Sequence, residues 1–415
     1  MSVLQTIQQL QFIDQSAAEQ LLLLFLRDIS PFNVISVRLR PLAVSLNSFN
    51  GFMMLDDGRE LFFKTHTETD TIIDEYYHAD QLAQAGYPVV QPLYASQEAG
   101  KQILIYQVID DPSVFDVAWR IEQGDSTLLA ALTRAQEAAD DALLSIYLNT
   151  LAEQTAEQAA KAPIHQLFHH RLAGGRLARF YGTASTPVDL TLPGGTFSMR
   201  QVRAARWTIN DQIYEITLDG LIEKALRLLE PAQAGPSIVG HGDAHNGNVF
   251  FEQASSSLVY FDPAFAGRHH PLLDLAKPLF HNVFAMWMYF PREKAETLQI
   301  SFRPEGLHWR VTHNYSLHPV RQMFLESKLV RVLVPLLREL AARNWLRLDW
   351  RDYLKAALFC CPLLTMNLAD RKKFPPEISL LGLAMSIEMG AESAGTRSII
   401  DSALDRAQAL LSEQV

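Results

Sequence analysis

The chain of 415 residues has only two cysteines, Cys360 and Cys361, and they are adjacent in the sequence. Neighbouring thiols rarely reach the geometry of a disulfide with each other, so nothing indicates an oxidising compartment. Long apolar runs are also missing, because the run from Leu21 to Leu26 is far shorter than the roughly 20 residues that a membrane span needs. The N-terminus lacks the positive charge of a signal peptide. These absences predict a cytoplasmic protein with no membrane segment.

Positive charge is scarce as well. The chain has 36 Lys and Arg against 46 Asp and Glu, a formal net charge of -10. Proteins that bind nucleic acids usually carry a basic face, so this balance argues against a nucleic-acid partner and favours a cationic or neutral substrate. With 48% hydrophobic residues the chain can bury a large core, and its length predicts two or three packed units.

The first hundred residues change their pattern once. Residues 3–28 contain no Gly or Pro and carry Leu and Ile at helical spacing, which predicts an N-terminal helical segment over 1–30. Short β-branched and aromatic runs then predict strands over 34–44, 51–55, 60–65 and 102–108. Asp56-Asp57-Gly58 is a hairpin signal between the second and third runs, and residues 70–85 favour a helix. The expected order is therefore a small antiparallel sheet carrying one helix.

The rest of the chain is mainly helical in pattern. After a hinge at Asp110-Asp111-Pro112 we expect helices over 126–161, 219–230, 274–289, 320–344 and 349–368. Two short apolar strands, over 249–251 and 258–261, interrupt them, and Pro193-Gly194-Gly195 indicates a hairpin. The predicted fold class is α+β, with a sheet domain over 31–108 and a mainly helical domain over 109–415.

One segment combines several chemically active side chains. Residues 241–248 read His-Gly-Asp-Ala-His-Asn-Gly-Asn, and Asp262 follows 14 residues after Asn248. A lone Asp or His beside a glycine is usually a turn residue, but this combination ahead of two strands and a further Asp is hard to obtain by turn chemistry. Phosphoryl transfer needs a carboxylate to orient the attacking hydroxyl, which suits Asp243. It also needs oxygen ligands for Mg²⁺, which suits Asn248 and Asp262.

This segment resembles the catalytic loop of the aminoglycoside phosphotransferase and choline kinase family, whose pattern is His-Gly-Asp-x-His-x-x-Asn. Residues 260–264, Tyr-Phe-Asp-Pro-Ala, together with Gly267, Pro271 and Asp274-Leu275-Ala276, resemble the metal-binding segment of that family. The two motifs that carry the resemblance lie within about 36 residues, from 241 to 276. It implies a two-lobed protein-kinase-like fold and an ATP- or GTP-dependent kinase that phosphorylates a small-molecule hydroxyl. The resemblance further implies that Asp243 is the catalytic base, and that His241, His245 and Asp274 support the loop.

The strands before the hinge provide a second test. A kinase-like lobe needs a strand lysine that reaches the α- and β-phosphates and a helix carboxylate that holds the lysine. Lys64 is the only strand lysine before the predicted helix. The apolar stripe of that helix places Glu75 at its edge and Asp74 nearly opposite, so we expect Glu75 to pair with Lys64, unless the two form only an exposed surface pair.

The other nucleotide contacts are predicted by position. The loop over 45–51 lies between the first two strands but has a single glycine, so Ser48 and Asn50 would contact the phosphates in place of a glycine-rich turn. The resemblance places adenine against the hinge backbone from Gln107 to Ile109 and an apolar wall that includes Phe261.

Several features stay open. The pairs His169-His170 and His269-His270 lack a second spaced ligand set and are interpreted as structural, not metal-binding. The basic run Arg171, Arg176 and Arg179 is interpreted as a solvated helix face, with the acceptor pocket as the alternative. The long segment from Asp111 to Ser237 is where we expect substrate specificity or a homodimer contact.

Other functions compete with the kinase hypothesis. A metal-dependent hydrolase would use as its ligands His241, Asp243, His245 and Asp262. A hydrolase of this kind would need a further ligand segment such as Gly-Asn-His, which the sequence lacks. The hydrolase hypothesis also gives no role to Lys64 and Glu75. A non-catalytic, kinase-like nucleotide-binding protein is the third hypothesis. Protein substrates are disfavoured because no Ala-Pro-Glu segment follows the loop. The acceptor is left open among aminoglycosides, amino alcohols, sugars and natural products.

Overall fold

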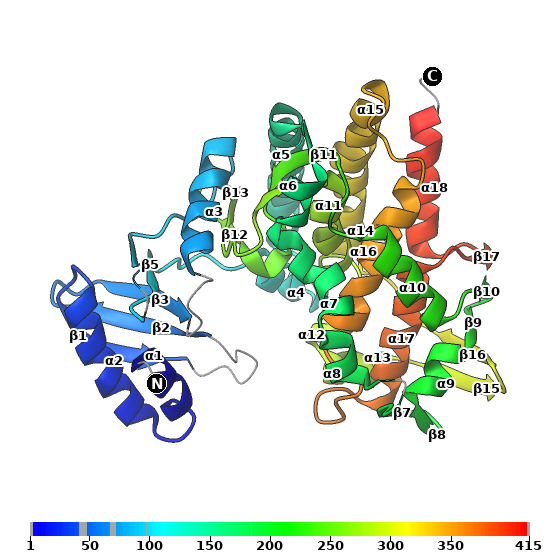
Figure 1. Ribbon diagram of the computed structural model, residues 1–415, viewed down its shortest axis with the longest axis horizontal. Coiled ribbons are helices and arrows are strands. Elements are labelled where there is room, and N and C mark those ends of the chain that lie inside the picture. The colour runs from blue at the N-terminus through cyan, green and yellow to red at the C-terminus, as the bar shows by residue number, and fades with distance from the viewer. Residues whose placement is uncertain are drawn as a thin grey trace. The chain divides into compact units, whose positions relative to one another are not determined.

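The computed structural model describes residues 3–40, 48–66, 72–96, 98, 100–183 and 185–412, without the side chains of Ser48, His66 and residues 72–77. The chain divides into two units. We call Met1–Pro112 together with Val259–Ala264 the sheet unit, and Ser113–Leu258 together with Phe265–Val415 the helical unit. Figure 1 shows the elements of each unit along the chain. None of the described helices is long and apolar enough to cross a membrane.

The sheet unit contains the expected antiparallel sheet. Its strands are β1 (Val34–Leu39), β2 (Ser48–Leu55), β3 (Glu60–His66), β4 (Tyr94–Ser96) and β5 (Ile103–Gln107), in the order β1-β2-β3-β5-β4. Helix α3 (Ile72–Ala85) lies between β3 and β4 in the chain. The hairpin predicted at Asp56-Asp57-Gly58 is confirmed: Gly58 adopts φ 85° and its N–H donates to Leu55 O at 3.1 Å.

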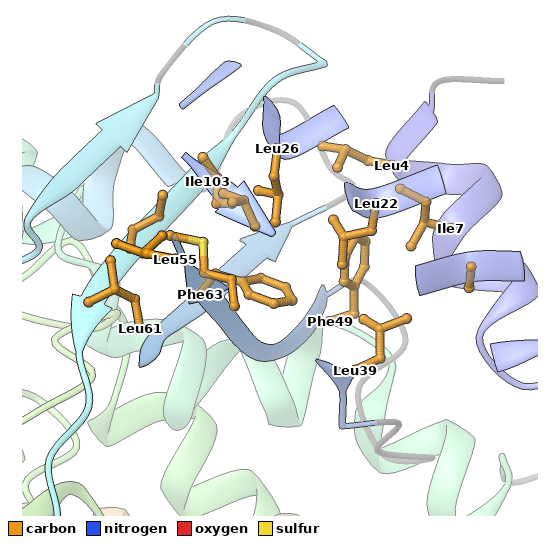
Figure 2. Close-up of a cluster of buried hydrophobic side chains, with 14 residues drawn as sticks. Leu4, Ile7, Leu22, Leu26, Leu39, Phe49, Leu55, Leu61, Phe63 and Ile103 are labelled. Atoms are coloured by element: carbon orange, nitrogen blue, oxygen red, sulfur yellow. The ribbon is translucent and has the colours of Figure 1, made fainter. Parts of the chain in front are cut away.

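The two faces of this sheet are covered differently. On one face α1 (Val3–Leu10) and α2 (Gln15–Ile29) pack against strand residues such as Phe63 and Ile103 (Figure 2). Alternate residues point to opposite faces of a strand, so Phe62 and Lys64 belong to the other face. There Leu104 and Tyr106 form a second, smaller apolar cluster with their neighbours. The N-terminal helices are thus part of the core of the sheet unit, and the other sheet face carries Lys64.

The helical unit is built on long buried helices. α11 (Pro271–His281), α16 (Trp350–Leu364) and α17 (Pro376–Gly390) bury nearly every residue, as expected for helices that are apolar on all sides. The other helices are α4 (Val114–Glu122), α5 (Leu129–Thr150), α6 (Ala156–Ala160), α7 (His169–Ala173), α8 (Arg176–Tyr181), α9 (Met199–Ala204), α10 (Leu218–Leu228), α12 (Met286–Tyr289), α13 (Pro291–Thr297), α14 (Pro319–Ser327), α15 (Val334–Ala342) and α18 (Ile399–Ser412).

The helical unit has more strand structure than the sequence pattern predicted. β9 (Arg206–Ile209), β10 (Gln212–Tyr214), β15 (Ile300–Glu305), β16 (His308–His313) and β17 (Ala394–Gly395) form one sheet. Its parallel pair β9–β16 joins segments about a hundred residues apart, such as Trp207 and Trp309. The expectation of only two strands besides the hairpin was therefore wrong, because short strands that pair at long range leave little local signal.

The predicted short elements are otherwise present. β7 (Asp189–Leu192) and β8 (Gly195–Ser198) form the hairpin expected at Pro193-Gly194-Gly195. The strands expected near the catalytic loop are β12 (Val249–Glu252) and β13 (Ser257–Tyr260). The helix expected over 320–344 is interrupted by a π-helical turn at Lys328–Leu333, where Lys328 pairs with Asp140 of α5. The helix expected over 126–161 breaks at Leu151 into α5, the short strand β6 (Ala152–Gln154) and α6.

Candidate active site

The predicted catalytic loop leaves the end of a buried strand. β11 (Gly235–Gly240) pairs on one side with β14 (Gly267–His269), so Gly240 lies opposite Gly267, and on the other side with β6. Gly242 then turns the chain with φ 80°, and a Cβ atom there would lie 2.4 Å from Phe265 O. Both facts require glycine at this position. The sharp turn directs the next residue, Asp243, away from the strand.

A buried carboxylate holds the start of the loop. Asp274, on the first turn of α11, accepts from the N–H of Gly242 at 2.5 Å and lies 2.9 Å from Nε2 of His269. The hydroxyl of Tyr147 donates to its second oxygen. Burial alone would raise the pKa of Asp274, but the hydrogen bonds from His269 and Tyr147 hold that pKa below its ordinary value. The structure thus places Asp274 where a residue supporting the loop would have to lie.

The rest of the loop is fixed by its own hydrogen bonds. The side-chain amide of Asn248 donates to Asp243 O at 3.0 Å, and the N–H of Gly247 donates to Nδ1 of His245 at 3.1 Å. The N–H of Asn246 donates to Oδ1 of Asn282, just beyond α11, at 2.7 Å. His241 is fully buried at the base of the loop. These contacts fix the position of Asp243 relative to Asn248.

The carboxylate of Asp243 is buried but open to a partner. Its Oδ1 accepts no hydrogen bond from any described residue. Burial alone would raise the pKa of Asp243, but nearby positive charge, above all that of Lys277, lowers it. Asp243 is therefore ionised at neutral pH. Its Oδ1 lies 3.6 Å from Nζ of Lys277 and accepts no hydrogen bond among the described residues, so it can still take a hydroxyl proton.

Lys277 was missed by the sequence analysis. It lies on α11 three residues after Asp274, and its Nζ is 3.6 Å from Oδ1 of Asp243 with the side chain only 3% exposed. Its Nζ is also 3.3 Å from Nε2 of His281, whose Nδ1 lies 2.8 Å from the hydroxyl of Tyr289. A lysine in an otherwise apolar helix was the available signal, because a buried lysine needs a charged partner.

In the sheet unit, Lys64 and Asp262 meet although 198 positions separate them. Nζ of Lys64 donates to Oδ1 of Asp262 at 2.8 Å, with side-chain exposures of 14% and 33%. Backbone hydrogen bonds two residues before Asp262 attach this segment to residues 88–90 of the sheet unit. The N–H of Tyr260 donates to Pro88 O at 2.7 Å, and the N–H of Val90 donates to Tyr260 O at 2.9 Å. Asp262 then adopts φ 56°, a conformation that is rare outside glycine and recurs at functional sites.

An apolar surface adjoins this pair. The Phe261 ring lies at 5.2 Å from that of Tyr106 and at 6.2 Å from that of Phe62, on the sheet face that carries Lys64. Gln107 is exposed at the end of β5, and Ile109 is partly buried beyond it. An adenine ring would need an apolar surface of this kind.

Two expectations about the phosphate loop change. Ser48 and Asn50 lie in strand β2, not in a loop, because Phe49 between them must be buried in the sheet core. Asn50 is directly opposite Lys64 in the register, so both side chains share one face. Oδ1 of Asn50 is buried without a hydrogen-bond partner among the described residues. Residues 45–47 lie outside the described residues, as does the side chain of Glu75.

Some residues offer oxygen ligands for a metal ion. With its amide nitrogen donating to Asp243 O, Asn248 keeps its Oδ1 for a cation, and Asp262 has a partly exposed carboxylate. Carboxylate and amide oxygens are both ligands of the kind that Mg²⁺ takes, together with phosphate and water. Within the described ranges, no group of three or more His, Cys, Asp or Glu could hold a metal. His169 instead lies 3.5 Å from Glu230, and His269 pairs with Asp274.

Comparisons with known proteins identify the family. Residues 40–302 match the sequence profile of the phosphotransferase enzyme family known as APH, over more than half of the chain. No curated protein sequence matches the chain. Several solved structures are similar at low identity. An amicoumacin kinase in complex with AMP-PNP and Ca²⁺ is 13% identical, with a TM-score of 0.43, over 94% of this chain and 93% of that chain.

Two further structures give the same level of likeness. A spectinomycin phosphotransferase in complex with ADP is 13% identical, with a TM-score of 0.42, over 89% of this chain and 98% of that chain. An ethanolamine kinase of Plasmodium vivax is 10% identical, with a TM-score of 0.39, over 92% and 84%. These likenesses are too weak to carry a conclusion about the substrate, and the assignment to a family rests on the profile match.

Proposed function

Because the chain belongs to the phosphotransferase enzyme family, we propose that it transfers the γ-phosphoryl group of ATP or GTP to a hydroxyl group of a small molecule. The observation that carries this proposal is the state of Asp243. An ionised carboxylate in a hydrogen-bonded loop, with a buried oxygen that accepts no hydrogen bond from the described residues, is suited to accept a proton from an attacking hydroxyl.

The reaction assigns a separate task to each group of residues. As the acceptor oxygen attacks the γ-phosphorus and the bond to the β-phosphate oxygen breaks, Asp243 orients the hydroxyl and takes its proton. Lys64 binds the α- and β-phosphates, and Asn50, which shares its sheet face, lies where it can contact the same group. The adenine or guanine ring lies against Phe261 and the backbone from Gln107 to Ile109.

Asn248 and Asp262 are proposed as the Mg²⁺ ligands. The metal, when bound, neutralises charge that develops on the phosphate oxygens. In the structure Asp262 pairs with Lys64, so the pair supplies opposite charges for the metal and for the phosphates at one place in the sheet unit. His241, His245 and Asp274 would keep the loop in position.

The test is a transfer assay with labelled γ-phosphate. The purified chain is incubated with Mg²⁺, labelled ATP or GTP and a panel of hydroxyl compounds, and the label is followed into an acceptor by mass spectrometry. Asp243→Asn should lose the transfer, and Asp141→Asn, an exposed aspartate of α5, should retain it. Label appearing only as inorganic phosphate in every mixture would favour a hydrolase. Failure to bind either nucleotide would contradict the proposal.

A further inference from the structure

Two buried or half-buried cations lie beside the proposed catalytic base. Lys277 Nζ is 3.6 Å from Oδ1 of Asp243. Arg171, on the short helix α7, is close enough to both residues to lower the pKa of Asp243 and that of Lys277. Of the charged groups around Arg171 and around Lys277, Asp243 has the largest effect on the pKa of each. The single negative charge of Asp243 therefore faces two positive charges, those of Lys277 and Arg171.

Within the described ranges, no other acid forms an ion pair with Arg171 or Lys277. The remaining groups that favour the charged forms of Arg171 and Lys277 are the thiols of Cys360 and Cys361. Burial raises the pKa of Cys361 to about 11 and that of Cys360 well above its usual value, so both thiols are neutral. The charges near Arg176 are positive too, those of Arg171 and Arg179. Among the described residues, no carboxylate forms an ion pair with these three arginines.

Arg171 also has an unused donor. Its Nε is buried without a hydrogen-bond partner in the described part of the chain. A buried donor that makes no hydrogen bond costs about 1–3 kcal/mol, and more when the group is charged. An oxyanion would remove this cost, because carboxylates and phosphates accept two parallel hydrogen bonds from a guanidinium.

The walls around this charge are neutral or aromatic. Burial lowers the pKa of His281 well below its usual value, so this histidine adds no charge at neutral pH. The hydroxyl of Tyr289 is hydrogen-bonded to His281, and the rings of Phe115 and Phe290 stack at 5.6 Å beside Tyr289. A cation placed here would meet repulsion from Lys277 and Arg171 without a compensating acid.

We propose that the hydroxyl acceptor carries an oxyanion, a carboxylate or a phosphate ester, that binds to Arg171 and Lys277 beside Asp243. This inference rests on the proposed function, because it places the acceptor hydroxyl at Asp243. It selects hydroxy acids and sugar phosphates over amino alcohols and aminoglycosides. It also opposes the expectation from the net charge of -10, since the local charge at the site has the other sign.

The first experiment compares matched acceptors. Glycerate is paired with glyceramide, glucose 6-phosphate with glucose, and choline serves as the cationic compound, each with Mg-ATP and Mg-GTP. The anionic member of a pair should be phosphorylated with kcat/KM at least about a hundredfold above its neutral partner. The two pairs distinguish a carboxylate from a phosphate ester. Preferred turnover of choline or of the neutral members would overturn the proposal.

The second experiment needs no turnover. Binding of sulfate, phosphate and malonate to the enzyme loaded with Mg-ADP is measured by calorimetry, for wild type, Arg171→Gln and Lys277→Met. Each variant should weaken anion binding at least about tenfold, whereas Lys161→Met, an exposed lysine of the same unit, should not. Anion binding that is absent in wild type, or equal in all four proteins, would overturn the proposal.

The same variants separate the acceptor from the nucleotide. If the two cations bind the acceptor, the affinity for Mg-ADP and Mg-AMP-PNP should change less than about threefold in Arg171→Gln. A loss confined to Mg-AMP-PNP would mean that they bind the γ-phosphate, which would overturn the assignment to the acceptor. Failure of the proposed function has a different signature: no Mg-nucleotide binding at all, with anion binding still measurable.

Discussion

The sheet unit and the helical unit each contain an ion pair at the proposed site, and the two pairs differ in charge balance. Lys64 and Asp262 match one cation with one carboxylate, 2.8 Å apart and partly exposed. Asp243 has two cations nearby, and the closer one, Lys277, is 3.6 Å away and almost fully buried. The charges of Lys64 and Asp262 cancel before any ligand binds. Around Asp243, in contrast, one positive charge has no negative partner.

This difference separates two tasks. In a balanced pair each member has a role toward the nucleotide, the lysine toward phosphate and the aspartate toward a metal. An excess of positive charge near a base lowers the base's pKa and attracts a negative group. This difference supports the proposal that the sheet unit binds the donor nucleotide and the helical unit binds the acceptor. Each prediction below changes one side of this comparison.

The largest effect is expected from Asp262→Ala in the sheet unit. The substitution removes a proposed metal ligand and leaves Lys64 without this carboxylate partner. Turnover should fall below detection and Mg-nucleotide binding should weaken clearly, because the phosphates lose their counter-charge. Steady-state kinetics and calorimetry measure both quantities. Asp80→Ala, an exposed residue of α3, is the matched control. Unchanged Mg-nucleotide binding in Asp262→Ala would remove Asp262 from the metal site.

The corresponding change in the helical unit is Asp243→Asn, which keeps the size of the side chain and removes its charge. General-base catalysis contributes typically ~10²- to 10⁴-fold, so kcat should fall by roughly two orders or more. Mg-nucleotide affinity should change less than about tenfold, because the residue acts on the acceptor. Near-normal kcat would show that Asp243 only stabilises the loop.

The core of the sheet unit can be weakened without touching either ion pair. Leu22 of α2 is fully buried against the sheet, whereas Leu24 of the same helix is 65% exposed. Leu22→Ala should destabilise the unit by about 2–5 kcal/mol, and Leu24→Ala by much less. Denaturant unfolding measures the difference. Equal effects of the two substitutions would mean that α2 does not pack on the sheet in solution.

Backbone strain in the helical unit is tested with two glycines. Gly242 and Gly124 both have positive φ, but only at Gly242 would a new Cβ atom meet a neighbour, Phe265 O at 2.4 Å. In Gly242→Ala the positive φ should destabilise the protein by about 1–3 kcal/mol, and the clash should add to this cost. The clash should also displace Asp243, so that kcat falls too. Gly124→Ala carries the φ cost alone. Thermal unfolding of both variants isolates the clash, and equal melting temperatures would contradict it.

The smallest effect concerns a buried carboxyl of the helical unit. Burial raises the pKa of Glu388 on α17 to about 8, against roughly 4.3 in an unfolded chain. The folded state thus binds the extra proton, so this contribution to stability is complete below the unfolded pKa and is lost as pH rises through about 8. Glu388→Gln should flatten the fall in melting temperature as the pH rises from the unfolded pKa, roughly 4.3, to about 8. Glu157→Gln, at an exposed position, should leave the fall unchanged.

Much of the sheet unit was predictable from local patterns. Alternating residues define β3 and β5, Gly58 marks the hairpin, and an uninterrupted apolar helix pattern marks α2. The phosphate loop was less predictable, because the burial of Phe49 extends β2 over Ser48 and Asn50, and a loop with one glycine gives no sign of where a strand begins. The sheet of β9, β10, β15, β16 and β17 was not predicted, because its strands pair across long separations in the sequence.

The sequence by itself indicated the family and the chemistry proposed for the catalytic loop, because the identity and spacing of residues 241–248 and Asp262 can be read directly from the sequence. Only the tertiary structure decided which charges meet. Lys64 reaches Asp262 across 198 positions, and Lys277 and Arg171 approach Asp243 from two separate helices. Electrostatic energy depends on distance in space and on burial, and neither quantity is fixed by separation along the chain. The net charge of the whole chain therefore does not determine the sign of the charge around Asp243.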